Sequence, residues 1–180
     1  KSFLTPREIQ KFKDYVPRND AQQRAKDFWF FCYYLNGIAP VDAVQLTVNN
    51  IRGSNIIFHR QKTAKSKAEA KPIVAHIHEE VQNILQRQGY MRPTHYLFPI
   101  LRPGMTAGEK VEAIDTWKRL TNRVLNRISV RLNFHIKANL YSARHSWATV
   151  MKLNDVSIHD ISDGLGHSRI NQTQNYLGTI

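Results

Sequence analysis

Cysteine is almost absent from this chain of 180 residues, because Cys32 is the only one. No disulfide can form within the chain, so we expect a protein of the reducing cytoplasm. Cys32 lies in the apolar run 28–35, where we expect a buried and inert thiol. The sequence also lacks an apolar stretch of about 18 residues and a signal peptide. We therefore expect no association with a membrane.

Metal-binding and nucleotide-binding patterns are absent as well. No cluster of His, Cys and acidic residues has metal-ligand spacing, and there is no glycine-rich phosphate loop. We therefore expect neither a metal nor a cofactor. Hydrophobic residues make up 42% of the chain and charged residues 22%, which is typical of one folded domain over 1–180. The chain begins at Lys1 without Met, so we interpret it as part of a longer protein.

Acidic residues are few, and this shortage gives the chain its most informative bulk property. Fourteen Asp and Glu face 26 Lys and Arg, which leaves a formal net charge of +12. Such a basic domain usually binds a polyanion, because neutralising phosphates releases counterions. A basic protein without a nucleic-acid role, or one that touches anionic lipid, is the alternative. The charge therefore predicts a polyanionic partner such as a nucleic acid.

Hydrophobic periodicity predicts a mainly α fold with a small antiparallel β-sheet, an α+β class. A first helix begins at 5–8, where Thr, Pro and Glu form an N-terminal capping pattern. The helix over 21–36 is dense in aromatic residues, which we interpret as core rather than as a surface for base stacking. Two strands, 55–60 and 73–77, form a hairpin with a cationic tip. The remaining helices are expected at 42–46, 79–87, 109–131, 142–153, 157–165 and 171–176.

Two groups of cations are candidates for contacts with a DNA backbone. Arg119, Arg123 and Arg127 recur every four residues and therefore lie near one face of their helix. A solvated helix face is the alternative for this stripe. Lys65 and Lys67 lie at the tip of the hairpin.

The last third of the chain contains a set of residues suited to phosphoryl transfer without a metal. Tyr176 can attack phosphorus and form a phosphotyrosine ester. Arg144 can hold the nonbridging oxygens and stabilise the charge of the transition state. His167 can donate a hydrogen bond to the same phosphate, and a lysine can protonate the leaving 5′ oxygen. Structural alternatives exist for each: an arginine paired with a carboxylate, a histidine capping a loop, and a tyrosine packed in the core.

A non-enzymatic DNA-binding module is the main rival interpretation. The segments 157–165 and 171–176 have the rhythm of a helix-turn-helix. This interpretation explains the net charge but leaves Arg144 and the cationic hairpin without a role.

The order and spacing of these motifs resemble the tyrosine recombinase (phage integrase) family over nearly the whole chain. The segment 144–149 reads Arg-His-Ser-Trp-Ala-Thr, 165–167 reads Leu-Gly-His, and Tyr176 follows nine residues later. The opening 4–8, Leu-Thr-Pro-Arg-Glu, also resembles the start of the family's catalytic domain. The resemblance implies site-specific DNA strand exchange through a 3′-phosphotyrosyl intermediate.

The resemblance also implies roles for individual residues. Arg144 corresponds to the second catalytic arginine, His167 to the His or Trp after Leu-Gly, and Tyr176 to the nucleophile. The lysine of the family's hairpin corresponds to Lys62, or less closely to Lys65. The acidic residue that supports the family's site corresponds to Asp42. The family further implies a tetramer on DNA and an N-terminal core-binding domain absent from this chain. The isolated domain is expected to be monomeric.

Two positions depart from the family pattern. Ala39 stands where the first catalytic arginine belongs, and Tyr141 stands where a histidine is usual. The chain is therefore either inactive or compensated. Because residues i and i+2 of a strand share a face, Arg60 should point the same way as Lys62 and supply the missing charge. In lacking the first arginine, this chain resembles the integrases of Bacteroides-type mobile elements. For Tyr141 we expect packing, with a hydrogen bond to phosphate as the alternative.

Overall fold

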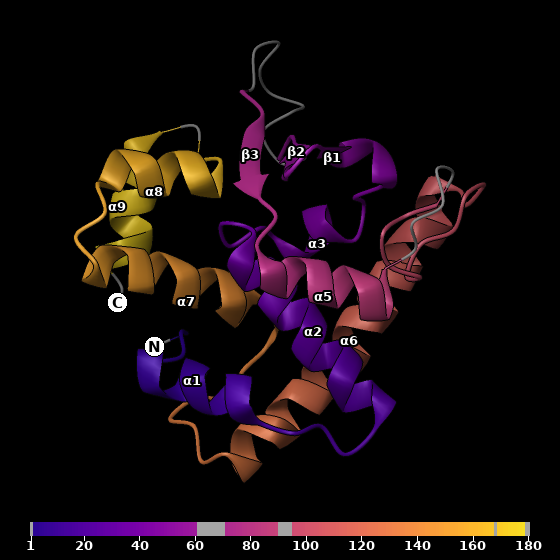
Figure 1. The fold of residues 1–180 in the computed structure, drawn as a ribbon, viewed down its shortest axis with the longest axis horizontal. Helices are drawn as coiled ribbons and strands as arrows, with labels where there is room; N and C mark the ends of the chain where they lie inside the picture. Colours follow the sequence, from indigo (N-terminus) through magenta and orange to yellow (C-terminus); the bar gives the residue numbers. More distant parts are fainter. Residues whose placement is uncertain (1, 61–70, 90–94, 168, 179–180) are drawn as a thin grey trace.

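The computed structural model describes residues 2–60, 71–89, 95–167 and 169–178, and it confirms a mainly helical fold with a small antiparallel sheet (Figure 1). The central element is α2 (Asp20–Tyr34), which contacts α5 (Glu79–Gln88), α6 (Ala107–Arg131) and α7 (Leu140–Leu153). The aromatic residues from Phe28 to Phe31 are buried, as predicted, whereas Tyr33 and Tyr34 are half-buried, and Cys32 is fully buried beside them. Burial raises the pKa of the Cys32 thiol, so the thiol is inert.

The turn after α2 brings the chain close to α7. Asn36 and Gly37 both have positive φ angles, 54° and 62°. A Cβ atom on Gly37 would lie 3.2 Å from the Cα of Arg144, so both the backbone conformation and the close approach favour glycine. The close approach of Gly37 to Arg144 therefore holds the end of α2 against α7.

The sheet has three strands in the order β1-β2-β3, all antiparallel. The predicted hairpin is confirmed, but its strands are shorter: β2 is Asn55–Phe58 and β3 is Ile73–His76. The strand β1 (Ile51–Arg52) was not predicted, because two residues are too few for an alternating pattern. A short 3-10 helix, Val48–Asn50, precedes it.

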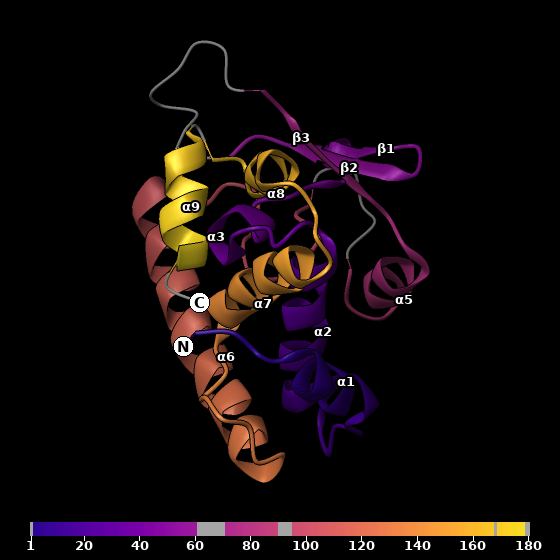
Figure 2. The same cartoon turned by 90° about the vertical axis from the view of Figure 1, so that its left-hand side faces the viewer.

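Several helix boundaries differ from the prediction. The helix predicted at 42–46 is wrong in its position: α3 is Pro40–Ala43, because Pro40 occupies the first helical turn, where its missing N–H costs nothing. The long helix α6 begins two residues early, at a capping box between Thr106 and Glu109. In Figure 2, α6 runs along one side of the molecule.

The first helix, α1 (Pro6–Asp14), is tied to the loop that leads into α7. Thr5 and Glu8 form the expected capping box. The Glu8 carboxylate also accepts hydrogen bonds from the His135 backbone N–H at 2.7 Å and from His135 Nδ1 at 2.8 Å. Burial raises the pKa of this carboxyl, but the hydrogen bonds from His135 and Thr5 outweigh it and lower the pKa to about 2. Glu8 therefore has a structural role.

The last three helices carry the candidate site. Figure 1 shows α8 (Ile158–Leu165) and α9 (Ile170–Gly178) beside each other at one end of the molecule, in contact with α7. They share a small core of Trp147, Ala148, Ile161, Leu165 and Leu177. Both helices and α7 begin within two residues of their predicted starts. Among the described residues, no helix is long and apolar enough to cross a membrane.

Candidate active site

Arg144 is the centre of the candidate site, and its side chain is 2% exposed. From α7, Nη1 donates to the carbonyl of Gly37 and Nη2 to the carbonyl of Leu165, both at 2.6 Å. These bonds fix the guanidinium between the end of α2 and the end of α8. Burial, followed by the nearby charge of Arg60, lowers the pKa of Arg144 to about 10, so the side chain stays cationic at neutral pH. A rigid buried cation is well suited to bind an anion.

His167 follows the end of α8, where Gly166 takes a left-handed conformation. His167 Nδ1 lies 2.8 Å from Thr173 Oγ1, and Nε2 lies 3.3 Å from Arg144 Nη2. A guanidinium only donates, so Nε2 accepts and the ring proton is on Nδ1, directed at Thr173. Burial, Arg144 and Arg60 lower the pKa of His167 to about 4, so the ring is neutral at pH 7.

Tyr176 lies on α9, and its hydroxyl oxygen is buried. Its ring stacks on His145, with centroids 4.4 Å apart and planes 4° from parallel. The ring of His167 stands edge-on to it, at 5.8 Å and 72°. Burial raises the pKa of the phenol, and Arg144 and Arg60 oppose this shift. The three residues predicted from the motifs therefore come together from three segments of the chain.

Arg60 lies beside this cluster, although not for the reason predicted. Because β2 ends at Phe58, Arg60 is outside the strand, and the argument from strand alternation is wrong. Its Nη1 instead approaches the carbonyl of Gly166 at 3.5 Å. Its charge lowers the pKa of both Arg144 and His167. The predicted lysines of the hairpin, Lys62, Lys65 and Lys67, lie outside the described residues.

The two departures from the family pattern differ in their surroundings. Ala39 is buried at the N-cap of α3, where no charge replaces the expected arginine at that position. Tyr141 is 44% exposed at the start of α7, and its ring centroid lies 6.1 Å from that of His145, so the expectation that it packs stays a prediction. Its hydroxyl is close enough to raise the pKa of Tyr176. Asp42 is buried on α3, and its charge acts to raise the pKa of Arg144, consistent with a supporting role.

The arginine stripe of α6 is exposed to solvent. Arg119, Arg123 and Arg127 are all exposed, and four-residue spacing separates them by about 6 Å along the helix axis. Arg131, one turn further, is also exposed and donates to Tyr15 Oη at 3.5 Å. The predicted stripe is thus accessible to a backbone of phosphates.

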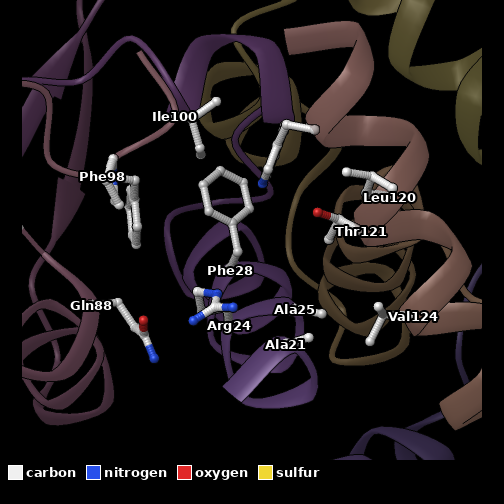
Figure 3. Close-up of a pocket in the computed structure, with 12 residues that line it drawn as sticks. Ala21, Arg24, Ala25, Phe28, Gln88, Phe98, Ile100, Leu120, Thr121 and Val124 are labelled. Atoms are coloured by element: carbon white, nitrogen blue, oxygen red, sulfur yellow. The ribbon is translucent and has the colours of Figure 1, made fainter. Parts of the chain in front are cut away.

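An apolar cavity of about 350 Å³ lies elsewhere, between α2 and α6. Figure 3 shows Phe28, Leu120 and Val124 around it, with Arg24 at its side. None of the residues that line it belongs to the cluster around Arg144, and it has no nucleophile paired with a base. The described residues also contain no group of His, Cys, Asp and Glu that could hold a metal ion. The residues predicted to act in phosphoryl transfer therefore lie around Tyr176 and away from this cavity.

Sequence reasoning missed two residues of the site, Thr173 and His145. Thr173 is fully buried and lies three residues before Tyr176, so both occupy one face of α9. A threonine in a helix carries no signal of such a role. His145 was visible as part of the motif, but its stack on Tyr176 depends on how α9 packs against α7.

Known proteins resemble this chain in sequence and in fold. The sequence model described as the Phage integrase family matches residues 2–179. A protein of Pseudothermotoga lettingae described as a tyrosine recombinase is 22% identical over 178 residues, which are 99% of this chain. The chain spans 56% of the length of that relative.

Solved structures share the fold. The Tn1549 transposon integrase in complex with circular intermediate DNA has a TM-score of 0.66 at 16% identity, over 96% of this chain and 61% of that one. XerH site-specific recombinase bound to palindromic difH substrate, a post-cleavage complex, has a TM-score of 0.67 at 13% identity. The match covers 99% of this chain and 50% of that one. The catalytic domain of bacteriophage HP1 integrase has a TM-score of 0.57 at 19% identity. The match covers 98% of this chain and 87% of that one.

Proposed function

Because this chain belongs to the phage integrase family of tyrosine recombinases, we propose that it cleaves and rejoins double-stranded DNA through a 3′-phosphotyrosyl bond to Tyr176. The observation that carries the proposal is the cluster of Arg144, His167 and Tyr176, drawn from α7, the loop after α8, and α9. A buried cation beside a tyrosine and a neutral imidazole supplies a phosphate clamp, a nucleophile and a group that can exchange a proton.

In this mechanism Arg144 binds a nonbridging oxygen of the scissile phosphate, and Tyr176 Oη attacks phosphorus. The bond from phosphorus to the 5′ oxygen breaks, and Lys62 protonates that oxygen. The phosphotyrosyl ester conserves the energy of the broken bond, so the strand is rejoined without ATP. The step needs neither a metal nor a cofactor.

Arg60 replaces the charge that Ala39 cannot provide. The support for this role is electrostatic: Arg60 lies close enough to Arg144 and His167 to lower the pKa of both. A phosphate between Arg60 and Arg144 relieves the repulsion between the two cations, which favours binding of the anion. This substitution of one arginine by another also motivates the proposal that the chain comes from a Bacteroides-type mobile element.

The whole protein requires more than this domain. The relative is longer than the chain, which covers 56% of it, and we propose that an N-terminal domain grips the other face of the DNA. The full-length protein acts as a tetramer on two duplexes, whereas the isolated domain is a monomer. Arg119, Arg123 and Arg127 contact the phosphate backbone without reading sequence.

A nicked DNA substrate tests the proposal. Cleavage close to the nick releases a short strand that diffuses away, so a covalent adduct between protein and DNA accumulates. We expect this adduct with the wild-type chain in the presence of a chelator, and its loss in Tyr176→Phe. Binding without any adduct would instead support the non-enzymatic DNA-binding module.

A further inference from the structure

The hydrogen bond between Thr173 and His167 fixes the protonation of the imidazole. Thr173 is fully buried, and its Oγ1 lies 2.8 Å from His167 Nδ1. On the other side of the ring, Nε2 faces the guanidinium of Arg144, which has only N–H groups to offer. The lone pair of the ring is therefore on Nε2, at the edge that faces the phosphate clamp.

Two histidines contact the ring of Tyr176, and their geometry differs. His145 is parallel to Tyr176, with 4° between the planes. The lone pair of an imidazole lies in its ring plane, so a nitrogen of His145 does not point at the tyrosine hydroxyl. The plane of His167 crosses that of Tyr176 at 72°. Of these two rings, that of His167 also contacts Arg144, so its unprotonated Nε2 lies at the phosphate clamp beside the ring of Tyr176.

We propose that His167 is the general base that takes the proton of Tyr176, and that Thr173 is a positioning residue that keeps Nε2 unprotonated and turned toward the reaction. This inference rests on the proposed function, because it requires Tyr176 to be the nucleophile. It assigns a different role from the donor role expected of His167 in the sequence.

Proton transfer from Tyr176 to His167 accompanies the attack on phosphorus. The Tyr176 Oη–H bond breaks as the bond from Oη to phosphorus forms, and the proton goes to His167 Nε2. The bond from phosphorus to the 5′ oxygen breaks, and a cationic lysine protonates the departing oxygen. The imidazolium then donates from Nδ1 to Thr173 and from Nε2 to a phosphate oxygen. In rejoining, Nε2 returns its proton to the phenolate oxygen.

The charges around His167 make this transfer depend on bound phosphate. Arg144 from α7 and Arg60 after β2 face the ring and disfavour an imidazolium, and Tyr176 from α9 is neutral until it attacks. A phosphate anion between the two arginines offsets their charge. His167 therefore becomes basic when the substrate is in place, and the free protein keeps its nucleophile protonated.

Variants of Thr173 test the positioning role. Thr173→Val keeps the shape but removes the acceptor, whereas Thr173→Ser keeps the hydroxyl. Without an acceptor for Nδ1–H the imidazolium is less stable, so Thr173→Val should lower the plateau rate of single-turnover cleavage about tenfold. It should also move the acidic limb of the pH profile to lower pH, and Thr173→Ser should restore both. A slower rate with an unmoved limb would show that Thr173 is only structural and overturn this part of the proposal.

A substrate with sulfur in place of the bridging 5′ oxygen tests the base itself. A thiolate leaves without a proton, so this substrate rescues variants that lack the general acid and does not rescue variants that lack the base. His167→Gln and His167→Trp should both cleave the ordinary substrate about 10²–10⁴-fold more slowly than wild type. They should stay slow on the sulfur substrate.

Two results would overturn the assignment of the base. Rescue of His167→Gln by the sulfur substrate would make His167 an acid. Near wild-type cleavage by His167→Trp, which can donate but cannot take a proton, would make it a simple donor to the phosphate. Failure of the proposed function looks different, because the wild-type chain would then form no adduct on either substrate.

Discussion

The ring of Tyr176 lies flat on the ring of His145, with 4.4 Å between the centroids. His145 directly follows Arg144 on α7, so the same turn of helix holds the phosphate clamp and the platform for the nucleophile. The stack thus couples the position of α9 to the position of Arg144. It also explains how a tyrosine on a short terminal helix is placed accurately next to a buried arginine.

Loss of this stack should slow cleavage. His145→Ala removes the platform, and aromatic pairs contribute about 0.5–1.5 kcal/mol beyond their buried area. We expect single-turnover cleavage of nicked DNA to fall about tenfold if this energy positions the nucleophile. His145→Phe keeps a ring and should cleave at nearly the wild-type rate. Equal rates for His145→Ala and wild type would show that the stack has no part in catalysis.

Removal of Arg60 should damage cleavage far more than removal of another surface arginine. Arg60→Ala removes one of two cations at the phosphate, and loss of such an electrostatic contact costs about 10²–10³-fold in rate. Arg52→Ala is the matched control, because Arg52 lies exposed on β1 and changes the net charge equally. Rates of adduct formation that are the same for both variants would contradict a catalytic role for Arg60.

Glu8 should stabilise the fold in a manner that depends on pH. Its folded pKa of about 2 lies below the ordinary value of 4.5, so its contribution is present above pH 4.5 and is lost as the pH falls toward 2. At pH 7 we expect Glu8→Gln to lower the free energy of unfolding by about 2 kcal/mol. Urea unfolding should show this difference shrinking at pH 3.

Glu109→Gln is the control for this experiment. Glu109 closes a capping box on α6 as Glu8 does on α1, but it is fully exposed, and Thr106 is its hydrogen-bond partner. Its replacement should therefore have a smaller effect. If Glu8→Gln and Glu109→Gln proved equal at pH 7, the contact with His135 would add nothing.

The α6 stripe should determine part of the salt dependence of DNA binding. Each cation that contacts a phosphate adds about one to the slope of log K against log salt. Replacing Arg119, Arg123 and Arg127 by Gln should reduce the slope by about three and weaken binding to all sequences alike. Lys13, which pairs with Glu80 on another face, provides the control. An unchanged slope would mean that the stripe is only a solvated face.

The sequence was informative where one local pattern determines the structure. The capping pattern of 5–8 predicted the start of α1, and the motifs around Arg144, His167 and Tyr176 predicted a site whose members do lie together. It failed where tertiary packing decides. Thr173 became important only through its position opposite His167, and the stack of His145 on Tyr176 depends on how α9 packs against α7.

Arg60 illustrates both outcomes. The sequence placed it at the site through strand alternation, but β2 ends before it and a loop carries it there. No local pattern distinguishes a strand that stops at Phe58 from one that continues to Arg60. Lys62, which was expected to point the same way as Arg60, lies outside the described residues.

Identification of the amino acid joined to DNA tests the central claim most directly. Trypsin cuts after Arg169, so a digest of the adduct from nicked DNA should contain a peptide that begins at Ile170 and includes Tyr176. After nuclease trimming, mass spectrometry should find this peptide with a 3′-linked nucleotide phosphate on Tyr176. A phosphate on another residue, or no modified peptide despite intact DNA binding, would contradict Tyr176 as the nucleophile.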